Sequence, residues 1–391
     1  MIIDGGREKL LVMENTYKGH LVIVVALEHY NPLGVLRTFG EAGIAPIWVG
    51  VKYKVPVASA CKYIQKRHAA ETIQDSYDIV MREYGHIGEQ DPDKKPFLIF
   101  CDDDVYNCFE EHYDEVMARF ITFNAGEKGR VTHFMQKKAI IDCAERHGIP
   151  VLKSIVVPVG QIPEGITYPV VTKAISPLAG AWKGDFHICE NEEQLKQSMA
   201  SIHTDEILIQ PYVDKKTEMT IEAFSYNHGK GMFAGVACQY RYAIRGYYSP
   251  LYDTFLPKDK ELLRKLNDMM EEIGFEGIWD AEFLVDKDDN IWFLEVNLRN
   301  STWSYSTTIA GNPLPLLWCE AMLTGKCREP KDFEPFISMI EPVDYTKRVE
   351  TGLCSLPQWL ADFKEAKCTF YYDKNDMEPW HVLEANWDKL K

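Results

Sequence analysis

The residues best suited to chemistry are acidic side chains inside a segment that otherwise has the pattern of two β-strands. Residues 277–301 read GIWDAEFLVDKDDNIWFLEVNLRNS, with the turn formers DKDDN at residues 286–290. Alternation on both sides of this turn predicts a hairpin with one polar face and one apolar face. The apolar face is expected to join a core and comprises Ala281, Phe283, Val285, Trp292, Leu294, Val296 and Leu298.

The expected register of this hairpin brings like charges together. With the turn centred between residues 288 and 289, Glu282 lies opposite Glu295, and Asp280 lies opposite Asn297. Opposed Cβ atoms are about 4.5–5.5 Å apart, so the two glutamates repel each other. Either one of them is protonated, with a raised pKa, or a cation lies between them. Carboxylate and amide oxygens of this kind suit Mg²⁺.

Three other interpretations of the hairpin compete with a metal site. The acids could face solvent, with Arg299 pairing with one of them, or they could form a raised-pKa pair for glycoside hydrolysis. A calcium loop beginning at Asp286 fails, because Ile291 stands where that loop needs glycine. Asn297 also stands where the loop needs a bidentate glutamate.

The composition is that of a globular chain long enough for two or three domains. The 391 residues are 46% hydrophobic, and 59 acids against 43 bases give a formal charge of −16. That balance argues against sequence-independent binding of nucleic acid. The ten cysteines form no CxxC pair and are expected to be reduced. The apolar run LVIVVAL is too short to span a bilayer, so we expect a cytoplasmic protein with no membrane partner.

The order of elements predicts an α/β unit followed by an α+β unit. The strand LVIVVAL, a helix over NPLGVLRTFGEAG and the strand IAPIWVG form a βαβ unit, and the strand PFLIFC runs into residues 102–104, DDD. Acids there either cap the next helix or line a ligand site. One amphipathic helix is expected over residues 133–148, followed by short strands. The tail from residue 363 predicts a strand and a helix.

These motifs together resemble the ATP-grasp superfamily. EFLVDKDDNIWFLEVNLR is similar to its closing metal motif, QPYVDKKTE to its adenine-binding hinge, YPVVTKAI to its phosphate-contacting strand, and MQKKAIIDCAERHGIPV to its opening helix. The N-terminal stretch resembles the D-aspartate ligase and carboxylate–amine ligase branch. The resemblance implies a Rossmann-like α/β pre-ATP-grasp domain at 1–130, an α+β ATP-grasp module at 131–345 and a C-terminal extension at 346–391. Within the module it implies a lid at about 150–213 and a metal-bearing part at about 214–345.

The resemblance also assigns roles to single residues. ATP and one or two Mg²⁺ ions are the implied cofactors, and Arg299 would steady the transferring phosphoryl group. The loop ISPLAGAWKGDF is poor in glycine, with Gly180 and Gly184 alone, so Lys183 would supply charge there. The residues implied to bind the nucleotide are Lys137, Lys173, Gln210, Tyr212 and Glu218, and those implied to bind metal are Glu282, Glu295 and Asn297.

The implied chemistry activates a carboxylate as an acyl phosphate and couples it to an amine, such as an amino acid or a cell-wall precursor. Arg241 and Arg245, in CQYRYAIRGYY, would hold an anionic acceptor, although a solvated basic loop explains them equally well. The alternatives are a carbamoyl-phosphate or carboxylase-type activity, and a nucleotide-binding protein without turnover. Small-molecule substrates and a homodimer are the partners that the resemblance implies.

Overall fold

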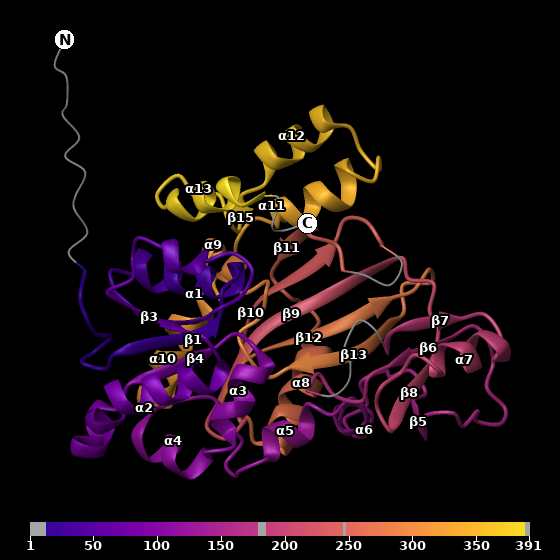
Figure 1. Ribbon diagram of the computed structural model, residues 1–391, viewed down its shortest axis with the longest axis horizontal. Helices are drawn as coiled ribbons and strands as arrows, with labels where there is room; N and C mark the ends of the chain where they lie inside the picture. Colours follow the sequence, from indigo (N-terminus) through magenta and orange to yellow (C-terminus); the bar gives the residue numbers. More distant parts are fainter. Residues whose placement is uncertain (1–12, 179–184, 245–247, 388–391) are drawn as a thin grey trace.

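The computed structural model describes residues 13–178, 185–244 and 248–387, which form three β-sheets with helices around them (Figure 1). The first sheet is parallel, with the order β3-β2-β1-β4. Its central strand carries the run VIVVAL and is buried along nearly its whole length, as the continuous apolar pattern predicts. The strands are β1 (Val22–Leu27), β2 (Ile47–Val51), β3 (Lys66–Ala70) and β4 (Phe97–Phe100).

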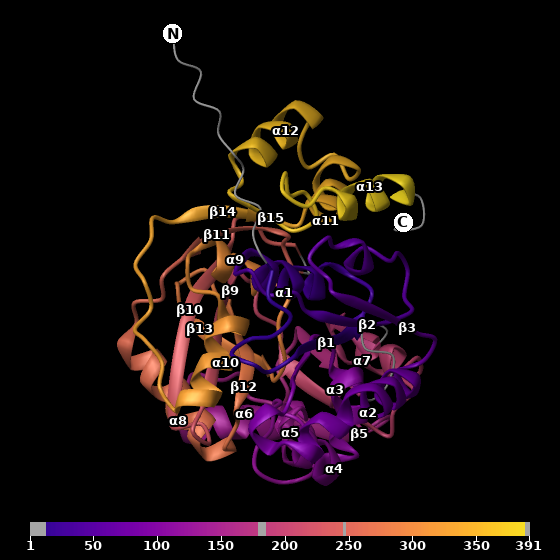
Figure 2. The ribbon, with the colours of Figure 1, turned by 90° about the vertical axis from the view of Figure 1, so that its left-hand side faces the viewer.

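Helices cover both faces of this parallel sheet. Figure 2 shows α1 on one side of β1 and β2, and α2 and α3 on the other side. α1 packs against two helices from a distant part of the chain, α9 and α10. The helices of this region are α1 (Tyr30–Glu41), α2 (Ile73–Gln90), α3 (Asp103–Glu110) and α4 (Tyr113–Arg119), with 3₁₀ turns at Ala58–Ala60 and Pro92–Lys94.

The second and largest sheet has seven strands in the order β13-β12-β9-β10-β11-β14-β15. All its neighbours are antiparallel except β14 and β15, which are parallel. Its strands are β9 (Thr217–Tyr226), β10 (Gly231–Tyr240), β11 (Leu251–Phe255), β12 (Gly277–Val285), β13 (Ile291–Asn297), β14 (Phe336–Met339) and β15 (Cys368–Thr369). Its helices are α8 (Lys260–Ile273), α9 (Tyr305–Ile309) and α10 (Leu314–Thr324).

The third sheet is small and antiparallel, with the order β5-β8-β6-β7. It projects beyond the edge strand β13 of the large sheet (Figure 1). Its elements are β5 (Ile155–Pro158), β6 (Val170–Lys173), β7 (His187–Cys189), α7 (Glu192–Met199) and β8 (Glu206–Pro211). Three separate sheets of this kind confirm the expected mixture of α/β and α+β structure.

The expectation of one continuous helix over residues 133–148 is wrong. The structure has α5 (Arg130–Phe134) and α6 (Lys137–Arg146), because Gln136 between them has an extended backbone. The backbone N–H of Lys137 then donates to the carbonyl of Ile175, at 2.8 Å, rather than continuing the first helix. The break therefore makes Lys137 the first residue of α6. α6 ends at Arg146, and the expected glycine stop, Gly148, follows the C-cap residue with a positive φ of 69°.

The C-terminal residues contain the expected strand and helix, and a buried arginine ties them to α1. The guanidinium of Arg37 donates to Asp376 Oδ2 at 2.9 Å and to the carbonyls of Phe370 and Tyr371 at 2.8 and 2.9 Å. A carboxylate, Glu341, accepts backbone N–H groups from the same stretch. The helices here are α11 (Glu341–Asp344), α12 (Leu356–Glu365) and α13 (Glu378–Ala385), with a π-helical turn at Tyr345–Val349.

The hairpin of β12 and β13 has the expected pairs, with one local difference. Glu282 pairs with Glu295 and Asp280 with Asn297, which confirms the predicted register at these positions. Phe283, however, pairs with Phe293, so β13 contains a bulge next to the glutamates. The bulge reverses the alternation beyond it, and Trp292 and Leu294 therefore leave the core face that the sequence assigned to them. Phe293 is buried there instead.

No helix in the described ranges is long and apolar enough to cross a membrane.

Candidate active site

The three sheets surround a cavity of about 910 Å³. Ligand sites in proteins commonly have volumes of about 300–1,000 Å³. Its walls combine the carboxyl ends of β1 and β4, the start of α6, the inner face of the small sheet, and the polar face of β12 and β13. The polar face of the hairpin thus lines a cavity, which excludes the interpretation that its acids simply face solvent.

The opposed pair Glu282 and Glu295 is stabilised unequally. Lys137, on the first turn of α6, forms a close ion pair with Glu295 Oε2. Burial alone would raise the pKa of Glu295, but the ammonium of Lys137, with Lys173 and Arg299 adding to its effect, lowers that pKa. The pKa of Glu282 is raised well above its usual value, by burial first and then by the charges of Glu295 and Asp280. The nearby cations therefore offset the burial of Glu295 but not that of Glu282.

An asparagine bridges the acids on this face. Asn297 Nδ2 donates to Asp280 Oδ2 at 3.0 Å and to Glu282 Oε1 at 3.2 Å, while its Oδ1 accepts from Arg299 at 3.2 Å. Asp280 is almost fully buried, and burial raises its pKa, with Glu222 on the adjacent strand adding to the effect. The amide holds the acids in place by donating to both carboxylates.

The arrangement fits a hard divalent cation such as Mg²⁺. Glu282 and Glu295 offer carboxylate oxygens from facing positions, and Asp280 Oδ1 is buried with no hydrogen-bond partner. Asn297 would add an oxygen only after its amide turned over, since its Nδ2 now faces the acids. A cation on this face would remove the like-charge repulsion that raises the pKa of Glu282.

Arg299 joins the hairpin to the parallel sheet. Its Nε lies 3.4 Å from Asp103 Oδ1, at the start of α3, and its Nη1 lies 3.8 Å from Asp280 Oδ1. Burial alone would lower the pKa of Arg299, but these carboxylates raise it, so the guanidinium stays charged. The side chain is only 17% exposed and borders the cavity. A fixed cation of this type can bind a carboxylate or phosphoryl group.

A second lysine lies on the small sheet across from the first. Lys173, the last residue of β6, borders the same cavity as Lys137. Burial and then the charge of Lys137 lower the pKa of Lys173 to about 8. The two ammonium groups thus repel each other across a space that an anion could fill.

The residues implied to bind a nucleoside also line the cavity, namely Gln210, Tyr212 and Glu218. Gln210 Nε2 donates to Ser154 Oγ at 2.7 Å, and its Oε1 is buried with no partner. Glu218 forms a close ion pair with Lys215, and burial raises its pKa in spite of that ammonium. An unsatisfied buried amide oxygen is costly, and a ligand N–H could satisfy it.

The carboxyl edge of the parallel sheet adds a histidine that sequence reasoning missed. Asn31 N donates to His29 Nδ1 at 3.2 Å, so Nε2 carries the proton and donates to Asp102 Oδ1 at 2.9 Å. Asp102 Oδ2 accepts from Leu27 N at 2.8 Å, and the side chain makes no capping bond to α3. Asp102, Asp103 and Asp104 border the cavity, which favours the second of the two interpretations offered above, that these acids line a ligand site. The sequence feature that could have identified His29 is its position just after β1, because ligands of open α/β sheets bind at the carboxyl ends of the strands.

Glu222 is a second residue that the sequence did not single out. It pairs with Asp280 across β9 and β12, accepts from Ser301 Oγ at 2.5 Å, and leaves Oε1 without a hydrogen-bond partner. Burial raises its pKa to about 8. Glu222 and Glu218 are four residues apart on β9, so their side chains point to the same face of the sheet. The local sequence pattern does not indicate, however, that β9 pairs with β12.

Not all the expected cations reach the cavity. The described lining residues do not include Arg241, whose Nε lies 3.7 Å from Asp253 Oδ1 on a side chain that is 37% exposed. The solvated-loop interpretation therefore fits Arg241 better than a catalytic role. Lys183, Arg245 and the loop glycines Gly180 and Gly184 lie outside the described residues.

Comparisons with known proteins agree with this geometry at the level of the fold. No protein-family profile matches the chain. Over 152 residues the chain is 23% identical to the mitochondrial propionyl-CoA carboxylase alpha chain of Caenorhabditis elegans, covering 36% of this chain and 20% of that protein. Over 232 residues it is 23% identical to the mitochondrial methylcrotonoyl-CoA carboxylase subunit alpha of Rattus norvegicus, covering 48% and 31%. The chain thus spans about a fifth to a third of these relatives.

Solved structures match over much more of the chain. N5-carboxyaminoimidazole synthetase from Staphylococcus aureus, complexed with ADP, has a TM-score of 0.64 at 13% identity, covering 97% of this chain and 100% of that one. L-amino acid ligase from Bacillus licheniformis has a TM-score of 0.62 at 11% identity, covering 83% and 81%. Biotin carboxylase from Campylobacter jejuni has a TM-score of 0.61 at 17% identity, covering 81% and 75%. The chain shares the fold of these enzymes.

Proposed function

We propose that this chain, which belongs by its fold to the ATP-grasp superfamily, is an ATP-dependent ligase that activates a carboxylate as an acyl phosphate and couples it to an amine. The observation that carries the proposal is the convergence of Glu282 and Glu295 with Lys137 and Arg299 on one cavity. Opposed acids flanked by fixed cations suit a metal-bound polyphosphate. The acids supply metal ligands, and the cations supply charge for the phosphates.

On this proposal the nucleotide lies between the small sheet and the hairpin. Lys137 and Lys173 would bind its phosphates, since both side chains line the cavity and the charge of Lys137 lowers the pKa of Lys173. The buried Oε1 of Gln210 would accept from the exocyclic amine of the base, which would satisfy it. Tyr212 would line the same pocket, and Glu218 would take the ribose hydroxyls, exchanging its contact with Lys215.

Glu282, Glu295 and a turned Asn297 would hold Mg²⁺, and the ion would neutralise charge on the transferring phosphoryl group. The protein then has to position two reactions. A substrate carboxylate oxygen attacks the γ-phosphorus, and the bond to the ADP oxygen breaks. An amine nitrogen next attacks the acyl carbon, phosphate leaves with its bonding electron pair, and the nitrogen loses a proton. Arg299, held by Asp103, would steady the carboxylate or the acyl phosphate.

The parallel sheet would provide the amine side of the site. Asp102, Asp103 and Asp104 present carboxylates to the cavity, and burial together with Asp103 raises the pKa of Asp104. Such a negative edge attracts an ammonium group. His29 keeps Asp102 in place through its Nε2–H. The proposed division of the chain follows these roles. Residues 1–130 would form the domain that provides this edge, residues 131–345 would bind the nucleotide and metal, and residues 346–391 would form the extension that braces α1.

A second candidate differs only in the carboxylate. The curated relatives are carboxylase subunits, and two of the solved neighbours are a carboxyaminoimidazole synthetase and a biotin carboxylase. These names favour bicarbonate as the activated group, while the amino acid ligase favours an amino acid. The cavity provides cations for either anion.

One assay separates the candidates. ADP release with Mg²⁺ is measured across a panel of amino acids, with and without hydroxylamine, and with bicarbonate alone. Hydroxamate formation with an amino acid supports the ligase and identifies the activated carboxylate. ADP release that requires bicarbonate, with no hydroxamate from any amino acid, replaces the ligase by a carboxylase-type activity. Nucleotide binding without turnover on the whole panel refutes both and makes the chain a nucleotide-binding protein.

A further inference from the structure

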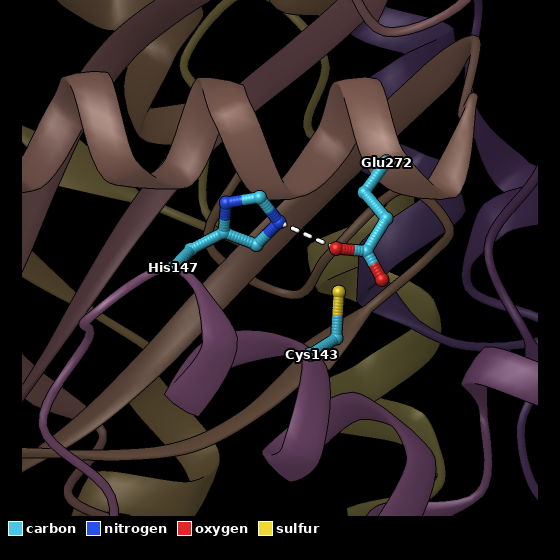
Figure 3. Close-up of side chains that lie close together, drawn as sticks. All are labelled: Cys143, His147 and Glu272. Atoms are coloured by element: carbon cyan, nitrogen blue, oxygen red, sulfur yellow. Dashed lines mark hydrogen bonds and ion pairs between the residues drawn. The ribbon is translucent and has the colours of Figure 1, made fainter.

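A cluster of three metal-binding side-chain types lies apart from the cavity, where α6 meets α8. Cys143 and His147 come from the end of α6, and Glu272 comes from the last turn of α8 (Figure 3). His147 Nε2 lies 2.7 Å from Glu272 Oε2. One ligand atom from each residue lies within 4.8 Å of the others. Of the described residues, these three form the one such group found.

The spacing explains why the thiol and the imidazole converge. Residues four apart on a helix lie one above the other on the same face, so Cys143 and His147 both point toward α8. Figure 3 shows the sulfur and the imidazole nitrogen approaching the carboxylate of Glu272 from two sides. This arrangement offers one sulfur, one nitrogen and one oxygen, and leaves a fourth position for water.

Neighbouring side chains hold the carboxylate in place. Arg146 forms a close ion pair with Glu272 Oε1, which leaves Oε2 directed at the imidazole. Arg130 donates to the carbonyls of Glu272 and Ile273, at 2.7 and 2.6 Å, and so fixes the end of α8. Outer contacts of this kind orient the ligands of metal sites.

We propose that Cys143, His147 and Glu272 form a binding site for a borderline-soft divalent cation of the Zn²⁺ type. Thiolate and imidazole ligands select such ions and disfavour Mg²⁺, which prefers oxygen ligands alone. The site is separate from the magnesium site proposed in the cavity and does not depend on the ligase activity.

Access and charge are both compatible with binding. The side chains of His147 and Glu272 are 22% and 34% exposed, so an ion can enter from solvent. Binding releases the thiol proton of Cys143 to water and needs the imidazole proton on Nδ1 rather than Nε2. Burial, followed by the charge of Glu272, raises the pKa of this thiol to about 12, which is a cost that the metal–sulfur bond must exceed.

An ordinary ion-pair cluster is the competing explanation, because Arg146, His147 and Glu272 would also attract one another without metal. The two explanations differ in the role of Cys143. An ion-pair cluster does not need a thiol, whereas a metal site needs its thiolate.

Titration of the metal-free protein with Co²⁺ tests the proposal, because a thiolate ligand gives cobalt a sulfur-to-metal charge-transfer absorption. We expect one equivalent of Co²⁺ to produce this band and Zn²⁺ to displace it. Cys143→Ser should abolish the band, and His147→Asn should weaken binding at least about tenfold. Cys108→Ser, which changes a half-buried cysteine outside the cluster, should behave as the wild type.

The melting temperature gives a second readout that is independent of activity. Zn²⁺ should raise it in a concentration-dependent way in the wild type and in Cys108→Ser, but not in Cys143→Ser. Cys143→Ala serves in the same role if the serine variant does not fold. Absence of the band in the wild type, or a band that persists in Cys143→Ser, overturns the site and leaves an ion-pair cluster.

Discussion

Glu282 and Glu295 lie directly opposite each other on β12 and β13, and Lys137 forms an ion pair with Glu295 alone. Lys137 makes this contact from the first position of α6, directly after the break that separates α5 from α6. The ammonium balances Glu295, whereas burial and then the charge of Glu295 raise the pKa of Glu282. A divalent cation would favour the charged form of Glu282, and we therefore propose that magnesium and nucleotide bind at this wall.

Replacement of Glu295 by Gln should lower Mg²⁺-dependent ADP release by about 100-fold or more, because the amide removes a metal ligand and its charge. The fold should survive, since this side chain borders the cavity and is 32% exposed. Steady-state ADP release and a thermal melt measure the two effects. Glu271→Gln makes the same chemical change on the exposed side of α8 and should keep full activity. Unchanged turnover in Glu295→Gln refutes the metal assignment.

Nucleotide affinity should fall as the pH rises above about 8. Lys173 has a lowered pKa of about 8 in the free protein, and a bound phosphate would raise it. Binding above pH 8 therefore takes up a proton, and Kd should increase by up to about tenfold per pH unit. Calorimetry in buffers of different ionisation enthalpy measures this proton uptake.

Two variants identify the group that titrates. Lys173→Arg keeps the charge at all these pH values and should flatten the profile. Burial also raises the pKa of Glu222 to about 8, so Glu222→Gln is the matched control. This variant should keep the wild-type increase of Kd with pH. A slope that disappears in Glu222→Gln and remains in Lys173→Arg would assign the effect to the acid instead.

The sequence pattern predicts much of the site, but it does not predict the residues that reach the site from distant parts of the chain. Alternation in the hairpin was enough to predict that Glu282 faces Glu295, because register in a short hairpin is local. The bulge that moves Trp292 and Leu294 was not predictable, since an extra residue in one strand looks like ordinary alternation until it is paired. Glu222 and His29 reach the site through sheet pairings between segments far apart in the chain.

The same limit applies to the helices and to the C-terminal extension. The helical period continues through residues 133–148, so nothing local indicated that Gln136 would be extended. The strand and helix after residue 363 were expected, but their attachment to Arg37 was not. A buried arginine in an apolar helix is a signal that could have been used, because such a charge needs partners from elsewhere.

Arg37→Met should destabilise the protein by about 3–5 kcal/mol, because it leaves the buried Asp376 without its cation and three backbone carbonyls without the guanidinium donor. The midpoint of denaturant unfolding measures the change, and hydrogen exchange should show faster exchange at Phe370 and Tyr371. Arg82→Met, at an exposed ion pair, is the control and should leave the midpoint unchanged. Equal midpoints for the two variants would show that the extension is held by other contacts.

Asp102→Asn should raise the KM for the amine by about 10- to 100-fold and leave the KM for ATP unchanged, since a hydrogen bond to a charged group contributes about 1.5–3 kcal/mol. On the proposed arrangement the carboxylate would attract the ammonium, and it accepts a hydrogen bond from His29 Nε2. ADP release as a function of amine concentration provides the measurement. Asp78→Asn, on the exposed side of α2, should match the wild type. An increased KM for ATP alone would place Asp102 on the nucleotide side.

The most direct test of the account is a crystal structure grown with Mg²⁺ and a non-hydrolysable ATP analogue. We expect Mg²⁺ bonded to carboxylate oxygens of Glu282 and Glu295 at about 2.0–2.1 Å and to phosphate oxygens of the analogue. Lys137 should then have moved from Glu295 toward the phosphates. An analogue whose phosphates lie away from both glutamates, with no metal on either carboxylate, would contradict the account.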